Sequence, residues 1–163
     1  MLLTGDLTAQ GFHSLAWAIV TGGFYHFFIL EPAKLDPLSR RWIRFAARVR
    51  RRYWREFTSS DVFVPDVVGD PGVRVMGYRH GNRQLIVGAP LQPKDQPDRP
   101  FRIAVSLPTH ARGPVGSEWL FGGGRVHADE RSGRCLVEGR GPFLLRFSGS
   151  RGSAQRAASG SPR

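Results

Sequence analysis

The sequence has little cysteine and lacks the short motifs that mark common catalytic and metal sites. Cys135 is its one cysteine, which excludes an internal disulfide framework and a cysteine-based metal site. The histidines lack the H-x-x-x-H and H-E-x-x-H spacings of zinc sites. There is no G-x-S-x-G nucleophile elbow, and the glycines at 122–124 lack the Lys-Ser/Thr ending of a phosphate loop. We therefore expect no metal and no cofactor, a turn at 122–124, and a small buried hydrophobe at Cys135.

Charged residues are also scarce near the start of the chain. Residues 11–30 contain none, and about 20 apolar residues are enough to span a bilayer. The stretch nevertheless includes histidine, serine and threonine, and the pair Gly22-Gly23 favours a break between two elements. The first residues, MLLTGDLTAQ, lack the basic segment of a secretory signal. We expect neither a membrane anchor nor a signal peptide here.

The first 58 residues predict two helices with a buried strand between them. Apolar residues recur at helical spacing over 8–21, between an N-cap at Thr8 and a stop at Gly22. Residues 24–30 are aromatic and apolar without that spacing, which is typical of a strand buried on both faces. Asp36-Pro37 then predicts the start of a second helix over 36–57. Its apolar stripe should face a core and its arginines should face water: Trp42, Phe45, Ala46, Val49 and Tyr53 against Arg40, Arg44, Arg48, Arg51, Arg52 and Arg55.

After residue 58 the pattern changes to eight short strand-like runs separated by turn residues. Ile103, for example, alternates with polar neighbours at the period of two that half-buried antiparallel strands show. Hairpin turns are expected at 80–82 and 131–133. We therefore predict an α+β chain with an α/β portion at 1–58, an antiparallel β-sandwich at 59–148 and a disordered tail at 149–163.

This order of elements resembles the C-terminal end of a (β/α)8-barrel glycoside hydrolase with its appended β-sandwich domain. The phrase FYHFFILEP is similar to the last barrel strand, the basic segment after it to the last barrel helix, and GNRQLIVGAPL followed by PFRIAVSLP to paired sandwich strands. The resemblance covers about residues 8–148 and contains no diagnostic motif. It implies a fragment of a carbohydrate-active enzyme that lacks most of its barrel, is inactive alone, and uses its sandwich to support the barrel or to contact glycan.

Glu31 is the one catalytic candidate that this resemblance suggests. Barrel enzymes place catalytic residues at the C-terminal ends of strands, and Glu31 directly follows the predicted strand. Glycosidases need two carboxylates, and no partner is available in this portion, since Asp6 precedes a helix and Asp36 serves as a cap. The alternative is that Glu31 only begins a loop. His26, inside the apolar strand, is more often a hydrogen-bonded core residue than a base.

The basic composition suggests a rival function. The formal net charge is +11, and clustered arginines next to aromatic residues are typical of nucleic-acid binding. The alternative to the enzyme fragment is therefore a basic module that binds nucleic acid or associates with a membrane. Because most of the aromatics share the stripe that should be buried, we expect a glycan as partner, no specific nucleic acid and no membrane.

Overall fold

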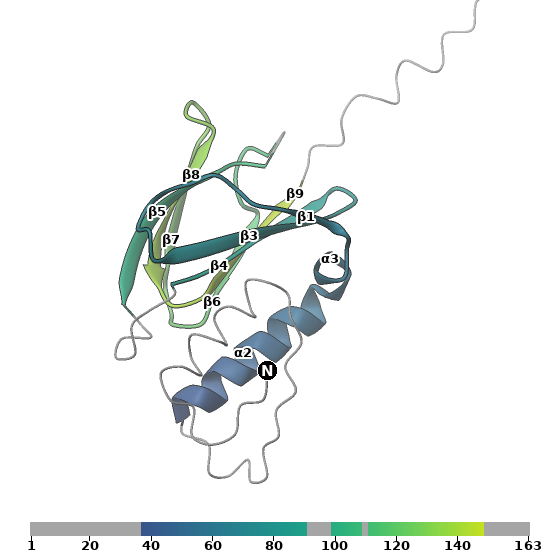
Figure 1. Cartoon of the computed structure of the whole chain (residues 1–163), viewed down its shortest axis with the longest axis vertical. Coiled ribbons are helices and arrows are strands. Elements are labelled where there is room, and N and C mark those ends of the chain that lie inside the picture. The colour runs from purple at the N-terminus through teal and green to yellow at the C-terminus, as the bar shows by residue number, and fades with distance from the viewer. Residues whose placement is uncertain (1–36, 91–98, 109–110, 149–163) are drawn as a thin grey trace, which may run out of the picture.

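The computed structural model describes residues 37–90, 99–108 and 111–148, apart from the side chains of residues 38 and 39. The predicted helix at 8–21, the strand at 24–30 with His26, Glu31 and the tail at 149–163 lie outside the described residues. The described part therefore comprises the second predicted helix and the sandwich, which are drawn in colour in Figure 1.

The basic segment forms helix α2 (Pro37–Arg52), followed at once by the short helix α3 (Trp54–Phe57). Sequence predicted one helix over 36–57, and the structure differs at Tyr53, where φ is −116° and ψ is 32°. The hydrogen bonds nevertheless continue, because Tyr53 N donates to Val49 O and Phe57 N donates to Tyr53 O. Proline is well placed at the first helical position, where its missing N–H leaves no bond unmade.

Nine strands follow within the described residues, in two antiparallel sheets. Sheet A has the order β1-β3-β4-β9-β6 and sheet B the order β2-β5-β8-β7. The bounds in sheet A are β1 (Asp61–Phe63), β3 (Val73–His80), β4 (Arg83–Pro90), β6 (Gly116–Trp119) and β9 (Phe143–Ser148). Those in sheet B are β2 (Val67–Gly69), β5 (Pro100–Ser106), β7 (Arg125–Asp129) and β8 (Arg134–Arg140). The prediction of an α+β chain with an antiparallel sandwich is confirmed.

The strand count differs from the predicted eight because one apolar run divides in two. Residues 62–68 read as a single strand in the sequence, but Pro65 separates β1 from β2. Proline has no N–H to donate to a ladder, so a strand is readily interrupted there. The chain uses this break to pass from sheet A to sheet B.

Both predicted hairpin turns are present among the described residues. Gly81 lies between β3 and β4 with φ of 59°, and Gly133 lies between β7 and β8 with φ of 64°. Positive φ is the left-handed region that glycine adopts without a Cβ penalty. The glycine in each predicted turn is therefore what allows its hairpin to close.

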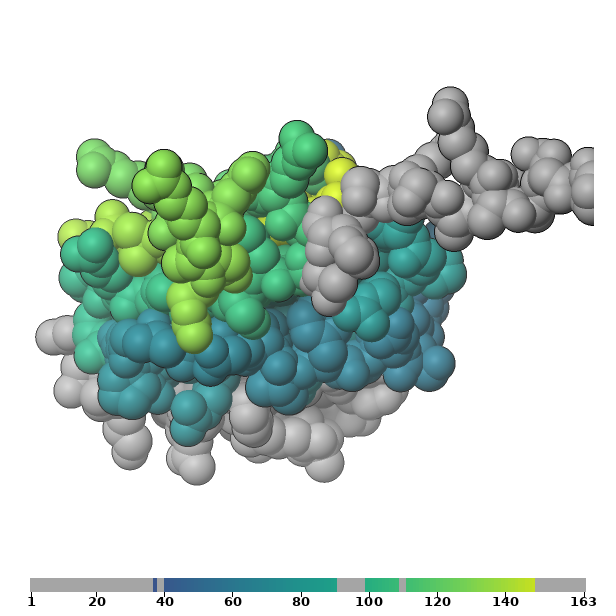
Figure 2. All heavy atoms as spheres, turned by 90° about the horizontal axis from the view of Figure 1, so that it is seen from above, coloured from purple at the N-terminus to yellow at the C-terminus, as the bar shows by residue number. Residues whose placement is uncertain are grey.

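Two apolar clusters divide the molecule into three layers. One lies between the sheets and includes Ile103, Phe143 and Phe147. The other lies between sheet A and α2 and includes Trp42, Phe45 and Leu85. Sheet A is therefore covered on both faces, by α2 on one and by sheet B on the other, as Figure 1 shows. Figure 2 looks from the opposite end to α2, where the visible coloured surface is the sandwich and its loops.

Candidate functional site

A groove lies between α2 and the chain that follows β6. Its volume is about 680 Å³. On one side it is lined by Pro37, Arg40, Arg41, Arg44, Phe45 and Arg48, and on the other by Trp119, Leu120 and Gly122. Phe45 and Leu120 are buried and provide an apolar floor. The helix therefore gives this groove a basic wall, and we call it the arginine groove.

The opposite wall is rigid because Trp119 is packed on several sides. Its ring centroid lies 5.4 Å from that of Phe143 and 6.3 Å from that of Phe101. Gly124 and Gly139 press against the same indole, so closely that a Cβ would lie 2.1 Å and 2.2 Å from its atoms. Such contacts leave the ring one position. The core between the sheets therefore holds Trp119 in place at the edge of the groove.

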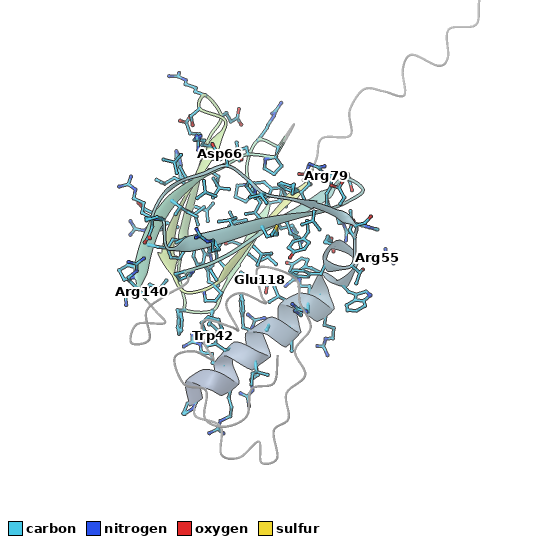
Figure 3. All side chains as sticks on the ribbon, in the orientation of Figure 1. Trp42, Arg55, Asp66, Arg79, Glu118 and Arg140 are labelled. Carbon is cyan, nitrogen blue, oxygen red and sulfur yellow. The ribbon has the colours of Figure 1, made fainter. Side chains whose placement is uncertain are left out.

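Glu118 ties α2 to the edge strand beside the groove. Its Oε1 accepts a hydrogen bond from the Tyr53 hydroxyl at 2.8 Å and lies 3.3 Å from Nη1 of Arg52. Its Oε2 lies 3.5 Å from Nε of Arg48. Burial is the main cause that raises the pKa of Tyr53, and the hydrogen bond to Glu118 adds to it. In Figure 3 Glu118 and Trp42 lie between α2 and the sandwich.

The outer side of α2 carries arginines that no described residue neutralises. Helix α2 contains seven arginines and no acidic residue in its sequence PLSRRWIRFAARVRRR. Glu118 accounts for Arg48 and Arg52, whereas Arg40, Arg44 and Arg51 have no ion pair among the described residues. Each of these three is exposed. The charge of this surface attracts anions and repels cations.

A second, smaller hollow of about 280 Å³ lies at the other end of α2, between α3 and the ends of β4 and β9. It is lined in part by Arg52, Tyr53, Arg83 and Arg146, and by Glu56, whose side chain is 3% exposed. Oε1 of Glu56 lies 3.8 Å from Nη1 of Arg83. The buried carboxylate makes this hollow less attractive to anions than the arginine groove.

The structure describes some of the residues singled out in the sequence and leaves Glu31 outside the described part. Cys135 is buried in β8 as predicted, and burial raises the pKa of its thiol to about 11, so it stays protonated and is a poor nucleophile. The glycines at 122–124 lie in the connection between β6 and β7, which bends at 120–122, and φ is 74° at Gly123. Glu31 lies outside the described residues, so its catalytic role stays a prediction.

The sequence alone did not reveal the arginine groove or the role of Glu118. The run EWLF reads only as a short strand, and nothing local signals that it lies against a helix more than 60 residues earlier. Within the described ranges no three side chains of the metal-ligating types lie together. No helix in the same ranges is long and apolar enough to cross a membrane.

Comparison with known proteins finds a weak structural likeness and no matching family. No family model matches the chain, and no curated protein matches it. Among solved structures, a maltogenic alpha-amylase from Thermotoga neapolitana, a glycoside hydrolase, is similar over 86% of this chain, with a TM-score of 0.48 and 14% identity. This chain spans only 36% of the length of that amylase. Similarity at this level is not evidence of shared chemistry.

Proposed function

We propose that this chain is the C-terminal part of a carbohydrate-active enzyme of the glycoside hydrolase kind. In this proposal residues 1–58 contribute the last elements of a (β/α)8 barrel, and the sandwich supports that barrel or contacts glycan. Glu31 supplies one of the two carboxylates that glycoside hydrolysis needs. The other carboxylate belongs to barrel strands that the sequence does not contain, so the chain by itself is inactive.

The observation that carries the proposal is the packing of α2 on sheet A. Trp42, Phe45 and Val49 of the helix share one buried cluster with Leu85 and Leu144 of the sheet. Only residues 58–60 connect α3 to β1. A sandwich joined to a helix by so short a connection and by a buried interface keeps a fixed orientation to that helix. This is what a domain that supports the last helix of a barrel requires.

A hydrolysis assay tests the catalytic part of the proposal. The purified chain and its Glu31→Gln variant are incubated with a panel of α- and β-linked glycosides, and released reducing sugar is measured. We expect no turnover above the blank for either protein. Turnover by the chain that Glu31→Gln abolishes would refute the fragment proposal while establishing Glu31 as catalytic. Sequencing the gene upstream of Met1 is a second test, since further strand and helix units should be encoded there in frame.

A truncation tests the structural part. Residues 59–148 without the helix would expose the apolar face that Tyr78, Leu85, Val87 and Leu144 now bury against α2. Exposed apolar surface of this kind leads to association. We expect residues 59–148 to aggregate and residues 37–148 to remain monodisperse in size-exclusion chromatography. A monodisperse, cooperatively unfolding 59–148 would show that the helix is dispensable and would contradict the supporting role.

A further inference from the structure

The exposed arginines of α2 form one stripe along the helix. Arg40, Arg44, Arg48 and Arg51 follow one another at intervals of four, four and three residues, so they lie on one side. At 1.5 Å per residue this stripe is about 16 Å long. Arg55 of α3, which is exposed and points away from the sandwich in Figure 3, follows Arg51 at the same spacing. We call these five residues the arginine stripe.

The positive charge of the stripe is not balanced by the rest of the described surface around it. Arg40, Arg44, Arg51 and Arg55 have no ion pair among the described residues. The one acidic residue of the two helices, Glu56, is buried and lies 3.8 Å from Arg83. Arginines three or four residues apart on a helix carry like charges that repel one another. A polyanion laid along the stripe would relieve that repulsion and release its own counterions.

We propose that the arginine stripe and the adjoining arginine groove bind single-stranded nucleic acid through its phosphates, without sequence specificity. This inference goes beyond the proposed function and is independent of it. Guanidinium groups match phosphate oxygens with two parallel hydrogen bonds. The groove brings four arginines together beside Trp119, whose indole is packed against Phe101 and Phe143 in the core between the sheets. Trp54, 51% exposed, lies next to Arg55 and offers the aromatic surface for stacking. Aromatic side chains beside a basic track are what unpaired bases stack on.

The same features disfavour a membrane and a neutral glycan as the occupant. A helix that lies in a membrane interface needs its apolar face for lipid, and here Trp42, Phe45 and Val49 are buried against sheet A. Neutral sugars present hydroxyl groups that both donate and accept. Guanidinium groups only donate, and the carboxylate nearest the groove, Glu118, already faces Tyr53 and two arginines. A ligand made of acceptors, such as a phosphate chain, fits better.

Binding to a fluorescein-labelled oligouridylate of 12 nucleotides, followed by anisotropy across a salt series, tests the proposal. For single strands the slope of log K against log salt is about −0.7 per phosphate neutralised. The four stripe arginines without an ion pair therefore predict a slope of about −2.8. The triple variant Arg40→Gln, Arg44→Gln and Arg51→Gln should weaken binding and reduce the slope by about 2. Circular dichroism verifies that the variant folds, which is expected because all three side chains are exposed.

A matched control removes the same charge elsewhere. Arg112, Arg125 and Arg131 are exposed residues of the sandwich, and their change to Gln should leave most of the affinity and the slope in place. Trp54→Ala should weaken binding several-fold with an unchanged slope, because stacking does not release counterions. No binding by the unaltered chain would overturn the proposal, as would equal losses in the two triple variants. Tighter binding to anionic lipid vesicles, or to a sulfated polysaccharide of equal charge, would also overturn it. None of these results depends on glycoside turnover, so the two proposals fail separately.

Discussion

Replacing Glu118 by Gln should destabilise the protein by loosening the contact between α2 and β6. The carboxylate accepts a hydrogen bond from Tyr53 at 2.8 Å and is 13% exposed. A hydrogen bond to a charged group contributes about 1.5–3 kcal/mol, roughly twice a neutral one. The amide oxygen of the introduced glutamine can still accept the hydrogen bond from Tyr53, so only about half of that contribution is lost.

The two ion pairs of Glu118 add less. The side chains of Arg48 and Arg52 are 58% and 60% exposed, and pairs this open to solvent contribute about 0.2–1 kcal/mol each. Together these contributions predict that Glu118→Gln lowers the free energy of unfolding by about 1–3.5 kcal/mol. The ion-pair part should fade in 1 M salt, whereas the part due to the hydrogen bond should remain.

Urea denaturation of four proteins measures the effect. The set comprises the unaltered chain, Glu118→Gln, Tyr53→Phe and the double variant, and the m-value should not change. The double-variant cycle should give a coupling energy of about 0.5–1 kcal/mol, because the two residues share a hydrogen bond. A Glu118→Gln variant as stable as the unaltered chain, or a coupling energy near zero, would refute the role assigned to Glu118.

Two further predictions concern the core. Gly139→Ala places a Cβ 2.2 Å from the Trp119 ring, and overpacking of this kind costs about 1–3 kcal/mol. We expect a lower urea midpoint and an altered near-ultraviolet circular dichroism spectrum; an unchanged spectrum would show that the ring is mobile. Burial raises the pKa of Tyr78 to about 12, so the unfolded chain loses this proton first, near its ordinary pKa of about 10. Stability from this group is complete below pH 10 and falls by up to about 2.7 kcal/mol as pH approaches 12. Tyr78→Phe should flatten that decline in urea titrations, and an equally steep decline would contradict the assignment.

Much of the fold follows from local patterns in the sequence. The caps and the apolar stripe predicted α2, and the alternation around Ile103 predicted a half-buried strand in β5. Pro65 was a visible signal for the break between β1 and β2, but the apolar residues on both sides of it concealed the change of sheet.

The candidate site was less predictable because it depends on contacts between distant segments. Trp119 and Arg44 line the same groove although they are far apart in sequence. Composition revealed the excess of arginine, but not which arginines have a carboxylate beside them. That distinction rests on Glu118, whose partners come from another element and leave no local trace.

Sheet A is buried on both faces, so the contrast between an apolar face and a polar face cannot fix the alignment of its strands. In β4 every residue after Arg83 is buried, so sliding the strand by one position would exchange one apolar face for another and incur little of the normal penalty. Shape must then supply the information that polarity does not. Gly88 lies opposite Phe143, and Gly77 opposite Phe63, with each phenyl ring covering its glycine. Each phenyl ring fits over its glycine in one alignment only, so Gly88 fixes how β4 pairs with β9, and Gly77 fixes how β3 pairs with β1.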